Sequence, residues 1–173
     1  MSKKDARRGH KAVKKTVPPA IVNRRASFDY DLSRDSVVGL SLTGGEVKAA
    51  RLGRVNLKGA YVVPKENPVK HRSELFLINA SFSIANNAPR SEKKDSTTVD
   101  TRSRKILAKR REIDELVGVR NTGATIIPTK LLTAGRHIKL VIALGKGKKK
   151  YDKRESIKRK DLVRENAKFL KRI

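Results

Sequence analysis

The sequence has no cysteine and no tryptophan, and only 4% of its 173 residues are aromatic. Without cysteine the chain can form no disulfide, thiolate nucleophile or zinc ribbon, and a cytoplasmic setting fits this absence. No stretch approaches the ~20 consecutive apolar residues of a membrane-spanning helix, and the charged N-terminus has no apolar run of signal-peptide length. We therefore expect a soluble protein that is neither secreted nor embedded in a membrane.

Groups that could carry catalysis or bind a metal are also scarce. The three histidines, His10, His71 and His137, have no carboxylate at metal-ligand spacing. The neighbouring acids Asp114 and Glu115 are expected on the solvent side of a helix, where they cannot work as a catalytic pair. The sequence therefore predicts no enzyme, no metal site and no cofactor.

Positive charge is what the sequence has in excess. Lys and Arg number 43 against 17 Asp and Glu, which gives a formal net charge of +26. The excess extends over both ends and the middle of the chain, so a localisation signal or a membrane-surface patch does not account for it, and an extended nucleic-acid footprint does. Because aromatic stacking platforms are few, recognition should rest on phosphate contacts and shape, which indicates a folded RNA.

The texture of the sequence divides the chain into three parts. Residues 1–20 are rich in cations and end at Pro18-Pro19, which predicts a disordered basic arm that is either a solubilising tail or an RNA contact. Residues 21–145 have the patterning of a β-rich RNA-binding domain. Residues 146–173 form a basic tail, and the stretch from Gly145 to Arg154 is expected to fit against phosphates without an ordered fold of its own.

Short strands dominate the expected domain. Phe28, Tyr30 and Leu32 alternate along one face, which predicts a strand that includes these residues. Gly39 marks a bulge or a point of close packing in the next strand, and Pro64 is expected to end a later one. Further strands are expected at 36–43, 60–63, 74–79 and 104–108, a hairpin at 124–133 and 137–144, and loops at 65–73 and 86–101. Connections this short favour a small antiparallel barrel over a parallel sheet.

Two short helices are expected inside the domain. Thr43 and Glu46 have the spacing of a capping box, which opens a helix that ends at Gly53. Lys48 and Arg51 are three residues apart, so they should share a face of that helix. Glu46 has two possible roles, as the partner of the Thr43 backbone or as an acceptor for base amino groups of RNA. The second helix is expected over 111–117, with Gly118 as its stop.

Several stretches closely resemble the SsrA-binding protein family, also called small protein B. They occur in the family's order and cover the chain from about Asn23 to its end. The matching stretches are 23–26, 29–30, 42–48, Arg51, Gly53, Leu57, Tyr61, 76–79, 104–107, 111–113 and 145–154. The resemblance implies an oligonucleotide-binding-type barrel that binds the tRNA-like domain of transfer-messenger RNA, and a tail that enters the decoding site of a stalled ribosome. The implied function is ribosome rescue by trans-translation, with elongation factor Tu as an indirect partner through the RNA, and the chain is expected to be a monomer.

The family's motifs imply two sets of site residues. Those expected at transfer-messenger RNA are Asn23, Arg24, Arg25, Glu46, Lys48, Arg51, Asn79, Arg104, Lys105, Lys146, Lys148 and Lys149. Those expected at the ribosome are Tyr151, Asp152, Lys153, Arg154, Lys158, Arg159 and Lys160. The chain departs from the family where a His commonly follows the equivalent of Asn79 by two residues, because Ser81 stands there. The alternative function is that of a structural ribosomal or RNA-packing protein, which would be equally basic.

The tail has the pattern of an amphipathic helix over 160–173. Apolar and charged side chains gather on opposite sides of that helix. So short and charged a helix is marginal in water, so we expect it to be disordered in the free protein and to fold when ribosomal RNA neutralises its cations. The alternative is that it packs permanently against the barrel.

Overall fold

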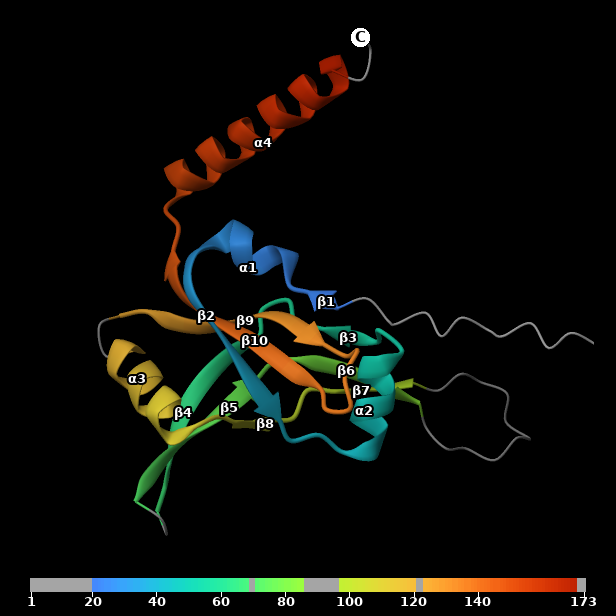
Figure 1. Ribbon diagram of the computed structural model, residues 1–173, viewed down its shortest axis with the longest axis vertical. Helices are drawn as coiled ribbons and strands as arrows, with labels where there is room; N and C mark the ends of the chain where they lie inside the picture. The colour runs from blue at the N-terminus through green and yellow to red at the C-terminus, as the bar shows by residue number, and fades with distance from the viewer. Residues whose placement is uncertain (1–19, 69–70, 86–96, 121–122, 171–173) are drawn as a thin grey trace, which may run out of the picture.

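The computed structural model describes residues 20–68, 71–85, 97–120 and 123–170 (Figure 1). The expected basic arm, apart from Ala20, and residues 86–96 of the expected long loop lie outside the described residues. No helix in the described ranges is both long enough and apolar enough to cross a membrane.

Six antiparallel strands close into a barrel. They follow one another in the order β9, β10, β2, β8, β5 and β4, and β4 returns to β9 where Val62 pairs with Ile126. The short strand β1 adds to the outer side of β9, and a small second sheet consists of β3, β6 and β7. The strands are β1 Ile21–Val22, β2 Tyr30–Leu40, β3 Val55–Asn56, β4 Tyr61–Asn67, β5 Arg72–Ile78, β6 Ser81–Ala85, β7 Thr97–Asp100, β8 Arg104–Leu107, β9 Thr125–Leu132 and β10 Lys139–Gly147. The expected mainly β class with an antiparallel barrel is confirmed.

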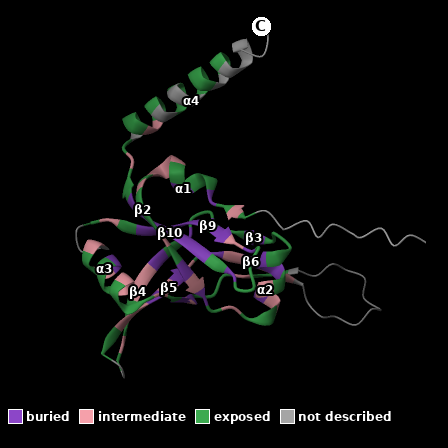
Figure 2. Cartoon of the chain, viewed as in Figure 1, coloured by how far each residue is buried: buried purple, intermediate pink, exposed green. Residues whose placement is uncertain are grey.

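Most of the buried residues lie on the strands of the barrel (Figure 2), and together they form a hydrophobic core. Leu75, Leu77, Leu131, Leu140 and Ile142 are completely buried. Burial of each such side chain contributes roughly 1.5–3 kcal/mol, so β5, β9 and β10 supply much of the driving force for folding. The expected hairpin of β9 and β10 is confirmed, with Leu140 opposite Leu131.

Gly39 is a point of close packing between β2 and β8. It pairs with Leu107, and a Cβ atom at Gly39 would lie 3.2 Å from the Cβ of Leu107. The absence of a side chain therefore lets the two strands approach, as one of the two readings of the sequence predicted.

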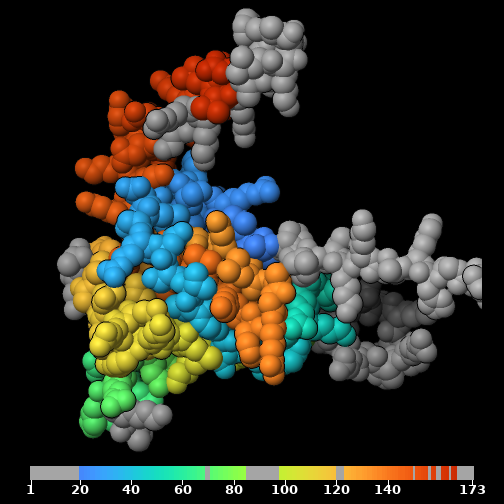
Figure 3. Space-filling view, viewed as in Figure 1, coloured from blue at the N-terminus to red at the C-terminus, as the bar shows by residue number. Residues whose placement is uncertain are grey.

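In the described parts of the chain four helices accompany the strands, namely α1 Arg24–Asp29, α2 Gly44–Arg51, α3 Arg110–Arg120 and α4 Lys150–Leu170. The predicted capping box of α2 is confirmed, with Thr43 as its N-cap and Glu46 at its third position. Helix α4 begins ten residues earlier than the expected tail helix and extends away from the barrel, above α1 (Figures 1 and 3). Its apolar residues Ile157, Leu162 and Val163 are exposed and take no part in the core.

The prediction of a strand through Phe28 is wrong at its start, because 24–29 is helix α1 and β2 begins only at Tyr30. The reason lies in the side chain of Asn23, whose Oδ1 accepts a hydrogen bond from the Ala26 amide at 3.3 Å. An N-cap of this kind starts a helix and overrides the local alternation of Phe28, Tyr30 and Leu32.

Three other expectations for loops and ends are wrong. Strand β4 continues through Pro64 to Asn67, and β5 begins at Arg72, so most of the expected loop 65–73 is a hairpin. Pro64 is tolerated because β4 pairs with β9 only at Val62. Beyond Val62 β4 pairs with β5 alone, so one edge of the strand needs no N–H from the proline. Part of the expected long loop is strand β7, and β6 before it was not predicted. Helix α3 continues past Gly118, and Val119 beyond it packs against the core.

Candidate nucleic-acid interface

Asn23 fixes the place where α1 begins. Its Nδ2 donates to the backbone carbonyls of Leu57 and Pro128, both at 2.9 Å, and the side chain is buried. The next two residues, Arg24 and Arg25, are exposed. The predicted motif Asn23-Arg24-Arg25 therefore combines an internal anchor with two outward cations.

Asn23→Ala is expected to lower the free energy of unfolding by about 1–3 kcal/mol, because the cap is lost and two buried carbonyl groups each lose one hydrogen bond. Urea unfolding measures this change. Asn23→Asp is the matched control, because it keeps the acceptor for the cap but has no N–H to donate. An Asp variant as stable as the wild type would show that the two donated bonds contribute nothing.

A second amide holds the same turn from the other side. Asn79 has a left-handed backbone with φ of 59°, and its Nδ2 donates to the Gly59 carbonyl at 3.1 Å. Between the two amide-held carbonyls lies Lys58, which is exposed. Asn23 and Asn79 thus fix the backbone on the two sides of Lys58. Lys58 was not among the predicted site residues.

A cleft of about 460 Å³ separates α1 from this turn. Its walls carry cations and two aromatic rings, which suit phosphates and bases. The residues that matter here are Arg25, Tyr30, Lys58 and Tyr61. Tyr30 approaches Gly145 closely, because a Cβ atom at Gly145 would lie 3.1 Å from the Cβ of Tyr30.

The end of β10 brings a second group of predicted residues to α1. Lys146 pairs with Asp31 and Gly147 pairs with Tyr30, so 146–147 continue the barrel strand instead of lacking a fold of their own. Lys148 then donates from its Nζ to the Ser27 carbonyl at 3.0 Å, and Lys149 is exposed. Arg24, Arg25 and the lysines 146, 148 and 149 therefore gather at one end of β2.

Lys48 and Arg51 lie at the other end of β2. Both are exposed on α2, as predicted from their spacing, and Arg51 Nη2 donates to the Arg136 carbonyl at 3.4 Å. Strand β2 has 11 residues, which corresponds to roughly 35 Å. Cations that are close in the sequence thus form two separate basic surfaces, one at α1 and one at α2.

The structure corrects the expected RNA contacts of Glu46 and Arg104. Both are completely buried, and Arg104 Nε donates to Glu46 Oε1 at 2.7 Å. Arg102 donates to both carboxylate oxygens, at 2.8 and 2.6 Å, and the Thr43 amide donates to Oε2 at 2.6 Å. The Arg104 guanidinium also lies 3.9 Å from the centre of the Phe82 ring. Glu46 is therefore the partner of the cap and of two arginines, and its oxygens do not face an RNA.

These contacts set the ionisation of Glu46. Burial by itself would raise the pKa of this carboxyl. The hydrogen bonds from Arg102 and the Thr43 amide, together with the charge of Arg104, outweigh burial and hold the pKa below its usual value. Glu46 is thus a carboxylate at neutral pH.

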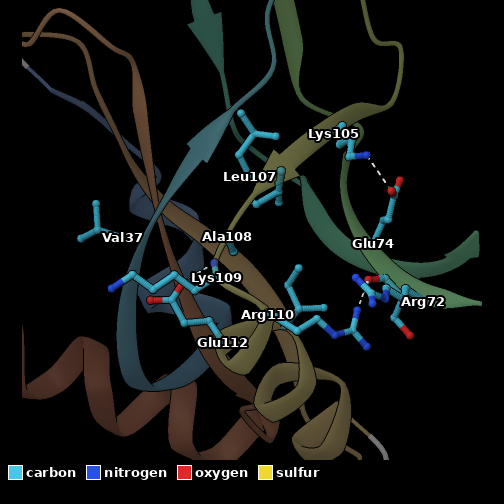
Figure 4. A pocket seen from close by; sticks show the side chains of 12 residues that line it. Val37, Arg72, Glu74, Lys105, Leu107, Ala108, Lys109, Arg110 and Glu112 are labelled. Atoms are coloured by element: carbon cyan, nitrogen blue, oxygen red, sulfur yellow. Dashed lines mark hydrogen bonds and ion pairs between the residues drawn. The ribbon is translucent and has the colours of Figure 1, made fainter. Parts of the chain in front are cut away.

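Lys105 lines an open groove of about 650 Å³ between β8, β5 and the start of α3 (Figure 4). Its Nζ lies 2.7 Å from Glu74 Oε1, so this predicted cation already has an acidic neighbour. Leu107 lines the same groove and is half exposed. Lys105 lies on β8, next to the end of β2, and its backbone carbonyl accepts a hydrogen bond from the Ser41 amide at 2.9 Å.

Some of the predicted tail residues have exposed side chains, and two others contact the barrel domain or the start of the helix. Tyr151, Arg154 and Lys158 are exposed, and Arg159 and Lys160 lie within α4. The Asp152 carboxylate accepts a hydrogen bond from the Lys149 amide at 3.0 Å, which helps to start the helix. Lys153 Nζ lies 2.8 Å from Asp29 Oδ1, and so joins the tail to α1.

Sequence reasoning missed five residues that shape these surfaces, namely Asp29, Tyr30, Lys58, Tyr61 and Arg102. Asp29, Tyr30 and Tyr61 lie in stretches that carry the family resemblance, and Asp29 is also four residues after Arg25, on the same face of α1. The others are brought in by contacts between distant segments. Within the described residues, no group of three or more acids and histidines could hold a metal ion.

A closed antiparallel barrel with two basic surfaces and a projecting basic helix defines the class of small cationic proteins that bind nucleic acid. The family model described as SmpB protein matches residues 20–172. The SsrA-binding protein of Ralstonia nicotianae is 41% identical over 86% of this chain and 95% of the relative. That of Coxiella burnetii (strain Dugway 5J108-111) is 42% identical over 87% of this chain and 89% of the relative.

A solved chain is also similar in structure. It comes from "tmRNA-SmpB: a journey to the center of the bacterial ribosome", is 33% identical, and superposes with a TM-score of 0.55. The match covers 80% of this chain and 94% of the solved one. The protein belongs to the SmpB family.

Proposed function

We propose that this protein binds the tRNA-like domain of transfer-messenger RNA and delivers it to stalled ribosomes for trans-translation. The observation that carries the proposal is the match to SsrA-binding proteins and to the solved tmRNA-SmpB chain along nearly their whole length. The net charge of +26 supports an RNA partner. The protein is an RNA-binding factor and not an enzyme, it works in the cytoplasm as a monomer, and elongation factor Tu is a partner only through the RNA.

The two basic surfaces are proposed to contact the tRNA-like domain. The contacting side chains of these surfaces are exposed or partly exposed, namely Arg24, Arg25, Lys146, Lys148 and Lys149 at α1, and Lys48 and Arg51 at α2. Asn79 at the turn and Lys105 in the groove are proposed as further RNA contacts outside the two surfaces. Asn23, Glu46 and Arg104 support these surfaces from inside. The tail residues from Tyr151 to Lys160 are proposed to contact the decoding centre and ribosomal RNA, where neutralised cations would stabilise α4.

The alternative, a structural ribosomal or RNA-packing protein, makes a different prediction about copurifying RNA. A rescue factor should be isolated with one tRNA-like RNA and with elongation factor Tu. A ribosomal protein should be present at one copy in every washed subunit. Sequencing the RNA that copurifies with the tagged full-length chain separates the two functions.

Binding of the tRNA-like domain should weaken steeply with salt, because each phosphate contact releases counterions and contributes about −0.7 to −0.9 to the log-log slope. Arg24→Gln should make the slope less steep by about one such contact, since Arg24 is exposed at the start of α1. The matched control is Lys65→Gln, which removes one exposed cation from β4, away from both basic surfaces. Fluorescence anisotropy over a salt series measures the slopes. An affinity that does not change with salt would contradict the proposed mechanism.

A further inference from the structure

The root of the tail helix is attached to the end of α1. Strand β10 ends at Gly147, opposite Tyr30. The amide of Lys148 then donates to the Asp29 carbonyl at 2.9 Å, which continues the pairing by one residue. Helix α4 begins two residues later, so its first turn lies beside the last turn of α1 (Figure 3).

The Asp29 side chain bridges the two helices. One of its oxygens, Oδ2, accepts a hydrogen bond from Arg25 Nε at 2.9 Å, and the other, Oδ1, accepts one from Lys153 Nζ at 2.8 Å. Lys153 also lies 5.7 Å from the centre of the Phe28 ring. The hydrogen bonds from Lys153 and Arg25 lower the pKa of the Asp29 carboxyl below its usual value, so the bridge is charged at neutral pH.

The two cations of this bridge belong to surfaces with different proposed partners. Arg25 belongs to the basic surface at α1, whereas Lys153 belongs to the tail. Helix α4 has 21 residues and a length of about 30 Å, so a tilt of roughly 20° at its root would move its far end by about 10 Å. Control of the first turn is therefore control of the direction in which the whole tail leaves the barrel.

The geometry points to Asp29 as a positioning residue that sets the direction of the tail helix by holding Lys153 against α1. This role rests on the proposed function, because the tail matters only if it must enter the ribosome while the barrel holds the RNA. The Asp29 side chain is only partly exposed, and each of its carboxylate oxygens already accepts a hydrogen bond. It acts through Lys153, and it connects the RNA-binding end of the barrel to the ribosome-binding helix.

Distances between spin labels test this role without RNA. Because the sequence has no cysteine, Ala134→Cys on the barrel and Leu162→Cys on α4 give two specific labels at exposed positions. The distance distribution of Asp29→Asn should be broader than that of the full-length wild type. Asp31→Asn is the matched control, because it removes the same charge from an exposed position two residues along the chain. Lys153→Gln should broaden the distribution as Asp29→Asn does, and the double variant should add nothing, since both remove one bond.

Peptide tagging on stalled ribosomes gives the functional readout. Asp29→Asn should lower the tagging rate by about three- to tenfold, because a smaller fraction of molecules presents the tail in the competent direction. Lys153→Gln also releases the tail but leaves the bond between Asp29 and Arg25 in place, so its affinity for the tRNA-like domain should stay within about twofold of the wild type. Asp29→Glu, which can still reach Lys153, should restore most of the tagging.

Three results would overturn the role of Asp29. They are an unchanged distance distribution in Asp29→Asn, a broadened distribution with unchanged tagging, and loss of RNA binding by the folded Lys153→Gln variant. If the wild-type chain itself did not bind transfer-messenger RNA, the proposed function would fail, while the label distances would still decide whether Asp29 orients α4.

Discussion

Glu46→Gln is expected to lower the free energy of unfolding by about 3–5 kcal/mol, because it removes the carboxylate that compensates a completely buried arginine. Arg104 would keep its charge in the core with its main acidic partner gone, and Arg102 would lose the same partner. A loss of this size is a large part of the ~5–15 kcal/mol that usually stabilises a domain. Urea unfolding followed by circular dichroism measures it.

Glu112→Gln is the matched control for this experiment. The Glu112 carboxylate accepts a hydrogen bond from the Lys109 amide at 3.0 Å, so it caps α3 as Glu46 caps α2, but its side chain is only partly buried. Glutamine can also fill this capping position, so the control should lose less than about 1 kcal/mol. Equal losses in the two variants would mean that the bonds to Arg102 and Arg104 contribute nothing beyond the cap.

Acidification should reproduce the effect of Glu46→Gln. The folded chain holds the Glu46 pKa below its unfolded value, so the contribution of this carboxylate is complete above the unfolded pKa. It is lost as the pH falls through the lowered pKa of the folded state. Stability of the wild type should therefore fall with acid more steeply than stability of Glu46→Gln over this range.

Removal of the chain after Lys150 is expected to abolish peptide tagging while affinity for transfer-messenger RNA stays within a few-fold of the full-length value. The cut removes residues 151–173, which include all of α4 except Lys150 and carry nine Lys and Arg against four Asp and Glu, but it leaves both basic surfaces of the barrel. Nearly all of the RNA contacts proposed for the barrel would remain. Anisotropy with the tRNA-like domain and a tagging assay on stalled ribosomes measure the two functions separately.

A cut after Leu170 is the control for this truncation, because it leaves α4 whole and should preserve tagging. A chain cut after Lys150 that still tags would show that the tail has no role on the ribosome. Loss of RNA binding by that chain would show that the tail is part of the RNA site. Either result contradicts the division of functions between barrel and tail.

Local patterns in the sequence predicted local structure well. The capping box needs only Thr43 and Glu46, and the hairpin of β9 and β10 needs only two apolar runs and a turn, so both were recognised. The start of α1 was not, because two of the bonds of its cap residue join Asn23 to carbonyls 34 and 105 residues away. No window of neighbouring residues contains that information.

The same distinction applies to the site. The spacing of Lys48 and Arg51 was enough to predict a shared exposed face. The role of Glu46 stayed open between cap and RNA acceptor because its arginine partners are 56 and 58 residues further along the chain. Position along β2 then separated Arg24 and Arg25 from Lys48 and Arg51, which are close in the sequence and at opposite ends of an 11-residue strand.

The order of the paired strands along the chain has a consequence for folding during synthesis. Strand β1 pairs with β9, and β2 pairs with β10, so the earliest strands of the chain wait for the latest ones. During synthesis the segment from Ile21 to Leu107 has no partner for β1 and none for one edge of β2 until 125–147 have emerged. Pairing across such separations makes folding slow, on the order of milliseconds to seconds. The barrel of this rescue factor can therefore close only after β10 has been synthesised, and a ribosome that stalls before β10 would release no working copy.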